Sequence, residues 1–283
     1  MNFNIIGAGR LGKNIALALS AARLAELVCI CNQDLASTEH SLKHLSFGSP
    51  AATISDLPAA DITWITSGDD AIQSIVTELM QNPNIKAGSF IIHCSGVLNS
   101  SILAPLKQKG CFVASLHPLK AFRSDYLQAQ AFNKVVCVLE GDEPVCNWLQ
   151  PSFERLGARI ITIQPEAKTN YHAAACIAAN YLVTLAHCSE ELFVQSGIDA
   201  KQAREITASL MQSSLDNIQN ADSTAQALTG PLMRGDLQTL SLHLQALEHQ
   251  VIKNLYRTLG LATLDLVSLS EEKIRALKVL LSQ

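Results

Sequence analysis

Apolar and polar positions follow two different patterns, which meet near residue 164. Before this point, short apolar runs are separated by segments whose apolar positions recur three or four residues apart, as in strands followed by helices. After Pro165 the chain shows only the helical spacing, in long stretches. The sequence therefore predicts an α/β domain over residues 1–164 and an all-helical domain over residues 165–283.

The apolar runs predict the strands of the first domain. They start just before Gly7 and continue at residues 27–31, 51–54, 61–66, 90–94, 112–115, 135–139 and 159–163. Helical spacing lies between several of them, over residues 9–22, up to Met80, and over residues 145–156. This alternation is typical of a doubly wound, mostly parallel sheet of the Rossmann type.

Four helical stretches make up the predicted second domain. They cover residues 166–195, 200–219, 237–259 and 271–281. Asp199 with Gln202 predicts a capped start for the second stretch, because a side-chain oxygen there can accept from the first free amides. Asp236 can cap the third stretch, and Gly260 can end it.

The first strand leads directly into a glycine-rich turn that opens a helix. The turn reads Gly7-Ala8-Gly9-Arg10-Leu11-Gly12. Gly7 permits a tight turn, Gly9 lets backbone amides approach a pyrophosphate, and Gly12 lets the helix pack closely on the strand. The free amides and positive dipole end of the helix then face the anion. In this context the turn predicts a dinucleotide-binding site.

The end of the second strand bears on the choice of cofactor. An acidic side chain there would bond the ribose 2′-hydroxyl of NAD and repel a 2′-phosphate. This chain has Asn32 and Gln33, with Asp34 one position later. No Arg or Lys directly follows, although Arg10 could reach across from the first turn. The missing carboxylate favours NADP over NAD, and NAD stays open as the alternative.

Polar residues also follow the later strands, at the edge where ligands bind in open α/β sheets. Thr66, Ser67 and Gly68 follow one strand and are expected to line the cofactor crevice. His93, Ser95 and Gly96 lie at the end of the next strand and His117 at the end of the one after, and we expect them to face the same crevice. We expect Ser95 to hold the nicotinamide side or the substrate, and His117 to shape the nicotinamide pocket. Ordinary turn chemistry is the alternative for each of these residues.

Composition and charge exclude several classes of function. The net charge of −4 and the pI near 6.1 give no electrostatic footprint for nucleic acid. No apolar run reaches membrane-spanning length, and no signal peptide precedes the first strand. The eight cysteines are scattered, and we interpret them as reduced thiols, with Cys29 and Cys31 packed in the core. These features predict a soluble, cytoplasmic protein.

Four separated motifs resemble a bacterial family that joins a Rossmann-like domain to a helical domain of unassigned function. They are Ile92-His93-Cys94-Ser95-Gly96, Ser115-Leu116-His117-Pro118-Leu119-Lys120-Ala121-Phe122, Tyr171-His172-Ala173-Ala174 and Thr229-Gly230-Pro231-Leu232-Met233-Arg234-Gly235-Asp236. The order of features is also similar to pyrroline-5-carboxylate reductase, ketopantoate reductase, deazaflavin-dependent NADP reductases and β-hydroxyacid dehydrogenases. The resemblance implies an NAD(P)-linked oxidoreductase fold, with a homodimer formed through the helical domains. It implies no particular substrate.

Hydride transfer needs a group that donates or takes a proton at the heteroatom, and the first helix of the second domain is the natural supplier. Lys168 and His172 share one helix face, four residues apart. β-Hydroxyacid dehydrogenases and ketopantoate reductase carry Lys-x-x-x-Asn at the corresponding place, where this chain has His172. Along a straight helix, Lys168 and Asn180 are about 18 Å apart, so both cannot touch one reacting atom.

We therefore hypothesise that Lys168 donates the proton, that His172 orients or shares it, and that Asn180 contacts a more distant part of the ligand or the other domain. The alternatives are a solvated lysine, a packing histidine and a structural asparagine between helices.

Other chemistries are less well supported by the sequence. His93, Cys94, His117 and His172 have no metal-ligand spacing, so we expect no metal centre. The nucleophile elbow of a hydrolase is absent from the sequence. Arg234 could pair with a substrate carboxylate or phosphate, or lie on the surface beside a helix cap.

The sequence as a whole predicts an NAD(P)-dependent oxidoreductase, NADP preferred, that acts on a small carbonyl, hydroxy-acid or imine compound. A non-catalytic dinucleotide sensor with a protein partner is the alternative from another class.

Overall fold

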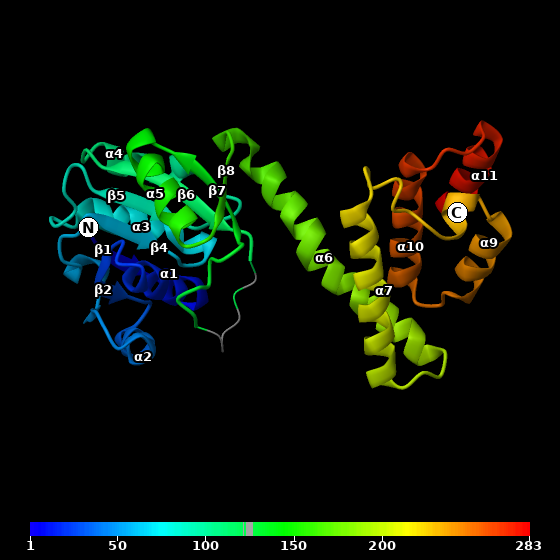
Figure 1. Cartoon of the computed structure of the whole chain (residues 1–283), viewed down its shortest axis with the longest axis horizontal. Coiled ribbons are helices and arrows are strands. Elements are labelled where there is room, and N and C mark those ends of the chain that lie inside the picture. Colours follow the sequence, from blue (N-terminus) through cyan, green and yellow to red (C-terminus); the bar gives the residue numbers. More distant parts are fainter. Residues whose placement is uncertain (121, 123–126) are drawn as a thin grey trace. The chain divides into compact units, whose positions relative to one another are not determined.

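A computed structural model describes residues 1–120, 122 and 127–283, and it divides the chain into two compact units (Figure 1). The first unit is Met1–Ile177 and the second is Ala178–Gln283. The division falls inside one continuous helix, so the boundary predicted at 164/165 stays a prediction. None of the helices in the described part of the chain is long and apolar enough to cross a membrane.

The first unit contains an eight-stranded sheet with the strand order β3-β2-β1-β4-β5-β6-β7-β8 (Figure 1). The strands are β1 (Asn2–Ile6), β2 (Glu26–Cys31), β3 (Ser49–Ala51), β4 (Ile62–Ile65), β5 (Phe90–His93), β6 (Phe112–Pro118), β7 (Val136–Gly141) and β8 (Arg159–Thr162). All neighbouring pairs are parallel except β6 and β7. The predicted Rossmann-type, mostly parallel sheet followed by helices is confirmed.

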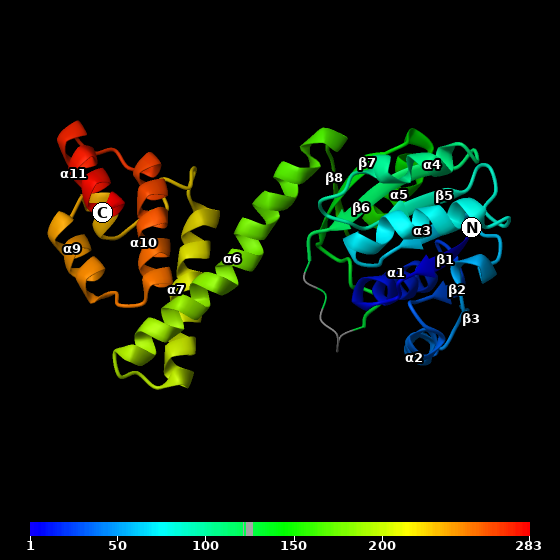
Figure 2. The ribbon, with the colours of Figure 1, turned by 180° about the vertical axis from the view of Figure 1, so that it is seen from behind.

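Helices connect the strands and continue beyond the sheet (Figure 2). The α-helices are α1 (Arg10–Ala21), α2 (Leu35–Leu45), α3 (Asp69–Gln81), α4 (Ala104–Lys107), α5 (Glu143–Arg155), α6 (Lys168–Gln195), α7 (Ala200–Asn220), α8 (Pro231–Arg234), α9 (Leu237–Ala246), α10 (Gln250–Thr263) and α11 (Glu271–Ser282). Short 3₁₀ turns cover Ile54–Asp56, Ser100–Leu103, Pro165–Ala167 and Leu264–Leu266.

Two strand predictions need correction. The run at residues 51–54 is not a strand: β3 ends at Ala51, and a 3₁₀ turn begins at Ile54. The strand expected over residues 112–115 continues to Pro118, because its last residues pair antiparallel with β7. This pairing places His117 on a strand rather than in the loop after it.

Helix ends in the second unit differ from the prediction in three ways. The stretch at 237–259 consists of two helices, because Leu247 is extended. Gly260 lies inside α10, where a β-carbon would come 2.9 Å from Leu281 of α11, so this glycine permits close helix packing. Asp236 occupies the N-cap position of α9 without a capping bond, since its carboxylate pairs with Arg234. Asp199 caps α7 as predicted.

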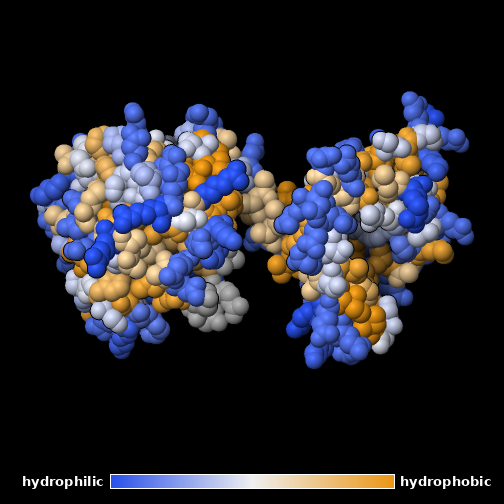
Figure 3. Space-filling view, in the orientation of Figure 1, coloured by the Kyte–Doolittle hydropathy of each residue, from blue (hydrophilic) through white to orange (hydrophobic). Residues whose placement is uncertain are grey.

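Long helices expose many apolar side chains, part of the orange surface in Figure 3. On α7 only Ala203 and Thr207 are buried, and on α6 only Lys168 is. The large exposed apolar residues of these two helices are Ile177, Tyr181, Val183, Val194, Leu210, Leu215 and Ile218. A core of leucines from α9, α11 and the turn after α10 holds the rest of the second unit together.

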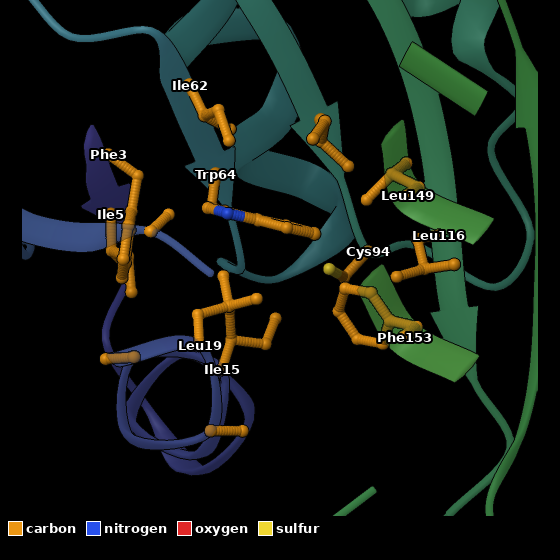
Figure 4. Packing of buried hydrophobic residues seen from close by; sticks show 14 of the residues in the cluster. Phe3, Ile5, Ile15, Leu19, Ile62, Trp64, Cys94, Leu116, Leu149 and Phe153 are labelled. Carbon is orange, nitrogen blue, oxygen red and sulfur yellow. The ribbon is translucent and has the colours of Figure 1, made fainter. Parts of the chain in front are cut away.

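Side chains of alternate strand residues build the two cores of the first unit, one on each face of the sheet. On one face, Trp64 packs with Ile15 and Leu19 of α1 and with Phe153 of α5 (Figure 4). On the other face, Ile65 of the same strand joins residues of α3 and α4. Because both faces of the sheet are buried, the strands are held in place, and the polar residues of the site lie at their ends.

Candidate active site

The glycine turn has the close approaches that its sequence predicts. Gly7 has a φ of +83°, and a β-carbon there would come 2.7 Å from the Ser67 nitrogen. A β-carbon on Gly12 would come 2.5 Å from Oγ1 of Thr66. That hydroxyl donates to the Gly7 carbonyl at 2.7 Å, so Thr66 braces the turn from the neighbouring strand. At Gly9 the nearest atom to a β-carbon would be 3.9 Å away, so the backbone is open to a ligand here.

The first turn of α1 has free donors for an anion. Gly9 is its N-cap, and it can provide no side-chain capping bond. Among the described residues, the amides of Arg10, Leu11 and Gly12 have no acceptor, as expected where a helix begins. The Ser67 hydroxyl lies beside this turn, buried and without a hydrogen-bond partner in the described part of the chain. This arrangement fits a dinucleotide pyrophosphate.

A cleft of about 510 Å³ lies beside the turn, at the carboxyl ends of β1, β2 and β4. Five predicted cofactor residues line it: Gly7, Asn32, Gln33, Ser67 and Gly68. Its other lining residues include Thr53 and Ile54 from the loop after β3, and Glu78 of α3. This is the switch point of the sheet, where the strand order reverses and ligands bind in doubly wound folds.

The side-chain amide of Asn32, which lines the cleft, is engaged in hydrogen bonds within the protein. Its Oδ1 accepts from the Ala8 amide at 2.6 Å, and its Nδ2 donates to the Ser37 carbonyl and the Ser41 hydroxyl at 2.9 and 3.0 Å. Both amide hydrogens are therefore used within the protein. Asn32 holds the glycine turn against α2, a helix that the sequence pattern did not predict, and Gln33 is the exposed neighbour.

A second group of polar side chains lies where β5, β6 and the start of α6 meet. The rings of His117 and His172 are 5.7 Å apart, and Tyr171 Oη lies 2.7 Å from Nδ1 of His117. A β-carbon on Gly96 would come 2.7 Å from His172 Nε2 and 2.9 Å from His117 Cε1. Gly96 thus lets both imidazoles approach the backbone, and its place after β5 brings it into this group.

Burial changes the proton affinity of these side chains. Burial, followed by the charges of His172 and Lys168, lowers the pKa of His117 to about 4, with Asp69 acting in the opposite direction. Burial also raises the pKa of the Tyr171 hydroxyl. His117 is therefore a neutral imidazole and Tyr171 a protonated phenol at neutral pH.

Lys168 lies beneath this group, with 1% of its side chain exposed. Its Nζ is 3.3 Å from Oε1 of Glu140 and also contacts the Ser115 hydroxyl. Glu140 accepts from the amide and the hydroxyl of Ser100 as well. Burial lowers the pKa of Lys168, and Glu140 opposes this effect. The alternative of a solvated lysine is wrong, and the ammonium group is paired inside the protein.

His93 and Ser95 occupy the turn after β5. His93 is fully buried and does not reach the crevice, contrary to its predicted position. Burial, then the charge of Lys168, lowers its pKa to about 3, and its Nδ1 accepts from the Ser95 amide at 3.2 Å. Ser95 Oγ accepts from the amides of Val97 and Leu98, as turn chemistry requires, while its own hydrogen has no acceptor among the residues that the structure describes.

The remaining candidates belong to the second unit or to the core of the sheet. Asn180 is exposed on the part of α6 that belongs to the second unit, and its role stays a prediction. Arg234 is paired with Asp236 at 2.8 Å, as in the surface alternative. Cys29 and Cys31 are buried in the core, where burial raises their thiol pKa values. Within the described residues, no group of three or more His, Cys, Asp and Glu side chains could hold a metal ion.

Two residues of the site were missed by sequence reasoning. Glu140 lies opposite Ser115 in the antiparallel pair of β6 and β7. The signal for it was a carboxylate at the end of an apolar strand, but the register of the strands is not visible in the sequence. Tyr171 directly precedes His172 in the Tyr171-His172-Ala173-Ala174 motif, but the sequence pattern assigns it no role. Ala121, from the motif that includes His117, lies outside the described residues.

Comparison with family models divides the chain in two. Residues 1–118 match a Rossmann-like domain, and residues 135–263 match a domain of unknown function, DUF2520. The chain joins a Rossmann-like domain to a DUF2520 domain. The predicted combination is confirmed, and the DUF2520 match begins at the last strands of the sheet rather than at the first long helix. Among curated protein sequences, none matches this chain.

Solved structures share the fold over nearly the whole chain. The candidate NADP oxidoreductase BF3122 from Bacteroides fragilis has 17% identity and a TM-score of 0.76, covering 92% of this chain and 96% of its own. Protein TM1727 from Thermotoga maritima has 23% identity and a TM-score of 0.68, covering 99% and 100%. Plasmodium falciparum pyrroline carboxylate reductase, solved with NADP bound, has 12% identity and a TM-score of 0.55, covering 100% and 96%.

Proposed function

We propose that this protein is a nicotinamide-dinucleotide-dependent oxidoreductase acting on a small carbonyl, hydroxy-acid or imine compound. The uncapped first turn of α1 carries the proposal, because its free amides, the open side of Gly9 and the unpartnered Ser67 hydroxyl fit a pyrophosphate. The shared fold with reductases supports the reaction class. A bound nicotinamide would supply or accept the hydride.

The protein's own residues would then bind the ligand and move a proton. The α1 amides hold the pyrophosphate, and the cleft at the ends of β1, β2 and β4 takes the adenosine half. We assign the proton to His172, which is half-buried beside Gly96, whereas Lys168 is enclosed by Glu140 and Ser115. In this assignment Lys168 supplies a fixed positive charge below the imidazoles.

NADP is the proposed cofactor in preference to NAD. Asn32 replaces the carboxylate that NAD-binding sites use for the ribose, and its amide is engaged within the protein. Glu78 also lines the cleft, and a carboxylate close to the ribose would disfavour the 2′-phosphate of NADP. Titration with both cofactors therefore decides between them.

The test is a fluorescence titration of the full chain with NADPH and NADH, followed by turnover assays with a panel of keto acids and imines. We expect binding of at least one cofactor, and His172→Ala to reduce turnover about 100-fold without weakening cofactor binding, as for loss of an acid–base group. His187→Ala, an exposed histidine on the same helix, is the control and should leave turnover unchanged. Absence of binding to both cofactors would refute the proposal.

We also propose that the chain forms a homodimer through its helical unit. The exposed apolar residues of α6 and α7 would be covered by a second copy, because such a surface is unusually apolar for a monomer. Sedimentation equilibrium should give twice the 30.5 kDa mass of the chain. Val183→Lys with Leu210→Lys should shift the equilibrium to monomer, whereas Val279→Lys on α11, at an equally exposed apolar position, should not. A wild-type monomer at all concentrations would contradict the prediction.

A further inference from the structure

Tyr171 and His117 form a hydrogen-bonded pair whose direction can be derived from their chemistry. The Tyr171 oxygen and His117 Nδ1 are 2.7 Å apart, with the two rings edge to face. A neutral imidazole carries one N–H, so Nδ1 either accepts from the phenol or donates to it. The phenol is the stronger acid and the imidazole nitrogen the stronger base, so the phenol donates. The imidazole hydrogen must then be on Nε2.

The surroundings of the ring keep it in this neutral form. Among the described residues, the groups that act on His117 are His172 and Lys168 of α6 and Asp69 of α3. Both α6 groups oppose a positive charge on His117, and burial opposes it further, which outweighs the attraction of Asp69. Lys168 cannot leave easily, because Glu140 and Ser115 hold its ammonium group inside the protein.

The ring of His117 lies against the backbone of Gly96. Its Cε1, the carbon between the two ring nitrogens, lies against Gly96 together with Nε2 of His172. Among the described residues, Nε2 of His117 has no hydrogen-bond partner, although the opposite nitrogen has one. The His117 residue is partly exposed, so a ligand can approach its ring. The donor is therefore oriented by the protein and has no acceptor in the described part of the chain.

We propose that Tyr171 is a positioning residue that fixes His117 as a neutral Nε2–H donor for a carbonyl oxygen of the bound ligand. This inference rests on the proposed function and narrows its substrate class. A neutral donor stabilises a carbonyl oxygen, on which negative charge develops during reduction. A protonated imine nitrogen is itself a donor, so its N–H would face the N–H of His117 and no hydrogen bond could form between them. Where this oxygen belongs to the substrate, the substrate is a ketone or aldehyde, or the corresponding alcohol, rather than an imine.

Nitrogen NMR of the full chain, labelled with ¹⁵N-histidine, tests the pair without any cofactor. At pH 7 we expect His117, identified by its absence in His117→Gln, to have a protonated Nε2 and an unprotonated Nδ1. A protonated Nδ1, or a doubly protonated ring, would overturn the proposal. Only the assignment of the signal needs the His117→Gln variant, and the tautomer itself is measured in the wild-type protein.

Tyr171→Phe keeps the ring and removes the hydroxyl, so Nδ1 loses its donor. We expect the His117 signal to change from one tautomer to a mixture of both, and turnover of a keto acid to fall about tenfold at unchanged affinity for the dinucleotide. Tyr181→Phe, on the same helix, keeps the apolar ring that the proposed dimer would cover and should change neither. Tyr256→Phe is the positive control for the method. The Tyr256 oxygen lies 2.8 Å from Nδ1 of His243, so this variant should change the tautomer signal of His243. An unchanged His117 tautomer in Tyr171→Phe would overturn the proposal.

The carbonyl oxygen can belong to the substrate or to the carboxamide of the cofactor. Adding the cofactor first and the keto acid second distinguishes these two possibilities. A shift of the His117 Nε2 signal with NADPH or NADH alone assigns the carboxamide, and a shift that needs a keto acid as well assigns the substrate. Turnover of keto acids without any shift of His117 overturns the proposal, as does turnover of imines alone when neither NADPH nor NADH by itself shifts the signal. Failure of the proposed function is recognised separately, by a protein with the expected tautomer that binds neither cofactor.

Discussion

Gly9→Asp is expected to reduce dinucleotide affinity at least 100-fold while the protein keeps or slightly gains stability. A β-carbon at this position has its nearest neighbour at 3.9 Å, so the side chain fits without displacing the fold. Aspartate is also a preferred N-cap, worth a few tenths of a kcal/mol over glycine. Its carboxylate would accept from the same α1 amides that the proposed pyrophosphate needs.

The loss of affinity follows from charge as well as competition. Two like charges about 4 Å apart repel each other by about 1 to 4 kcal/mol near a protein surface, and a pyrophosphate carries two charges. A cost of about 2.7 kcal/mol already corresponds to 100-fold in the dissociation constant. Gly9→Asp should therefore affect binding and stability in opposite directions.

Titration of NADPH and NADH fluorescence, alongside thermal unfolding, measures both effects. Gly9→Ala separates size from charge and should weaken binding about tenfold, with the free energy of unfolding within about 0.5 kcal/mol of wild type. Gly12→Ala should instead lower stability, since its β-carbon would come 2.5 Å from Oγ1 of Thr66. Full cofactor affinity in Gly9→Asp would show that the dinucleotide does not bind at this turn.

Lys168→Met is expected to lower the free energy of unfolding by about 3 kcal/mol, because removal of one partner leaves a charge buried without its counter-ion. The pair with Glu140 is 1% exposed on both sides. The two bonds from Ser100 remain in the variant and keep the loss near the lower end of the usual range for buried pairs.

Urea unfolding measures this loss, and a second variant identifies its origin. Lys168→Met combined with Glu140→Gln should recover most of it, because the buried charge is gone and the amide can still bond Ser100. Lys107→Met removes an ion pair with Asp142 that is 48% and 24% exposed, and should cost less than about 1 kcal/mol. A loss in Lys168→Met as small as in Lys107→Met would mean that the buried pair contributes little.

The architecture was largely predictable because it depends on local patterns. Apolar runs identify the strands of a sheet covered on both faces, and the glycine turn identifies its first crossover. Features that depend on distant partners were not predictable. The extension of β6 to Pro118 comes from its antiparallel pairing with β7, and Gly260 is buried against Leu281 rather than ending a helix.

The site was predictable as a set of positions but not as a set of roles. Gly96, His117 and His172 meet as their places at strand ends and on the first helix suggested. The enclosure of Lys168 was not visible, because Glu140 is close only through strand register. Nor could the pattern show that Asn32 is engaged, since its partners Ser37 and Ser41 belong to a helix that the pattern did not predict.

Asn32 has a consequence for how cofactor preference can evolve or be engineered in this protein. An aspartate at position 32 would set a carboxylate against the Ser37 carbonyl, where the amide now donates at 2.9 Å. The usual acidic substitution for NAD would thus loosen the attachment of α2 to the glycine turn. Gln33 lines the same cleft, is exposed, and has no hydrogen bond to any described residue. Selection for either cofactor can act at Gln33 while position 32 remains under structural constraint.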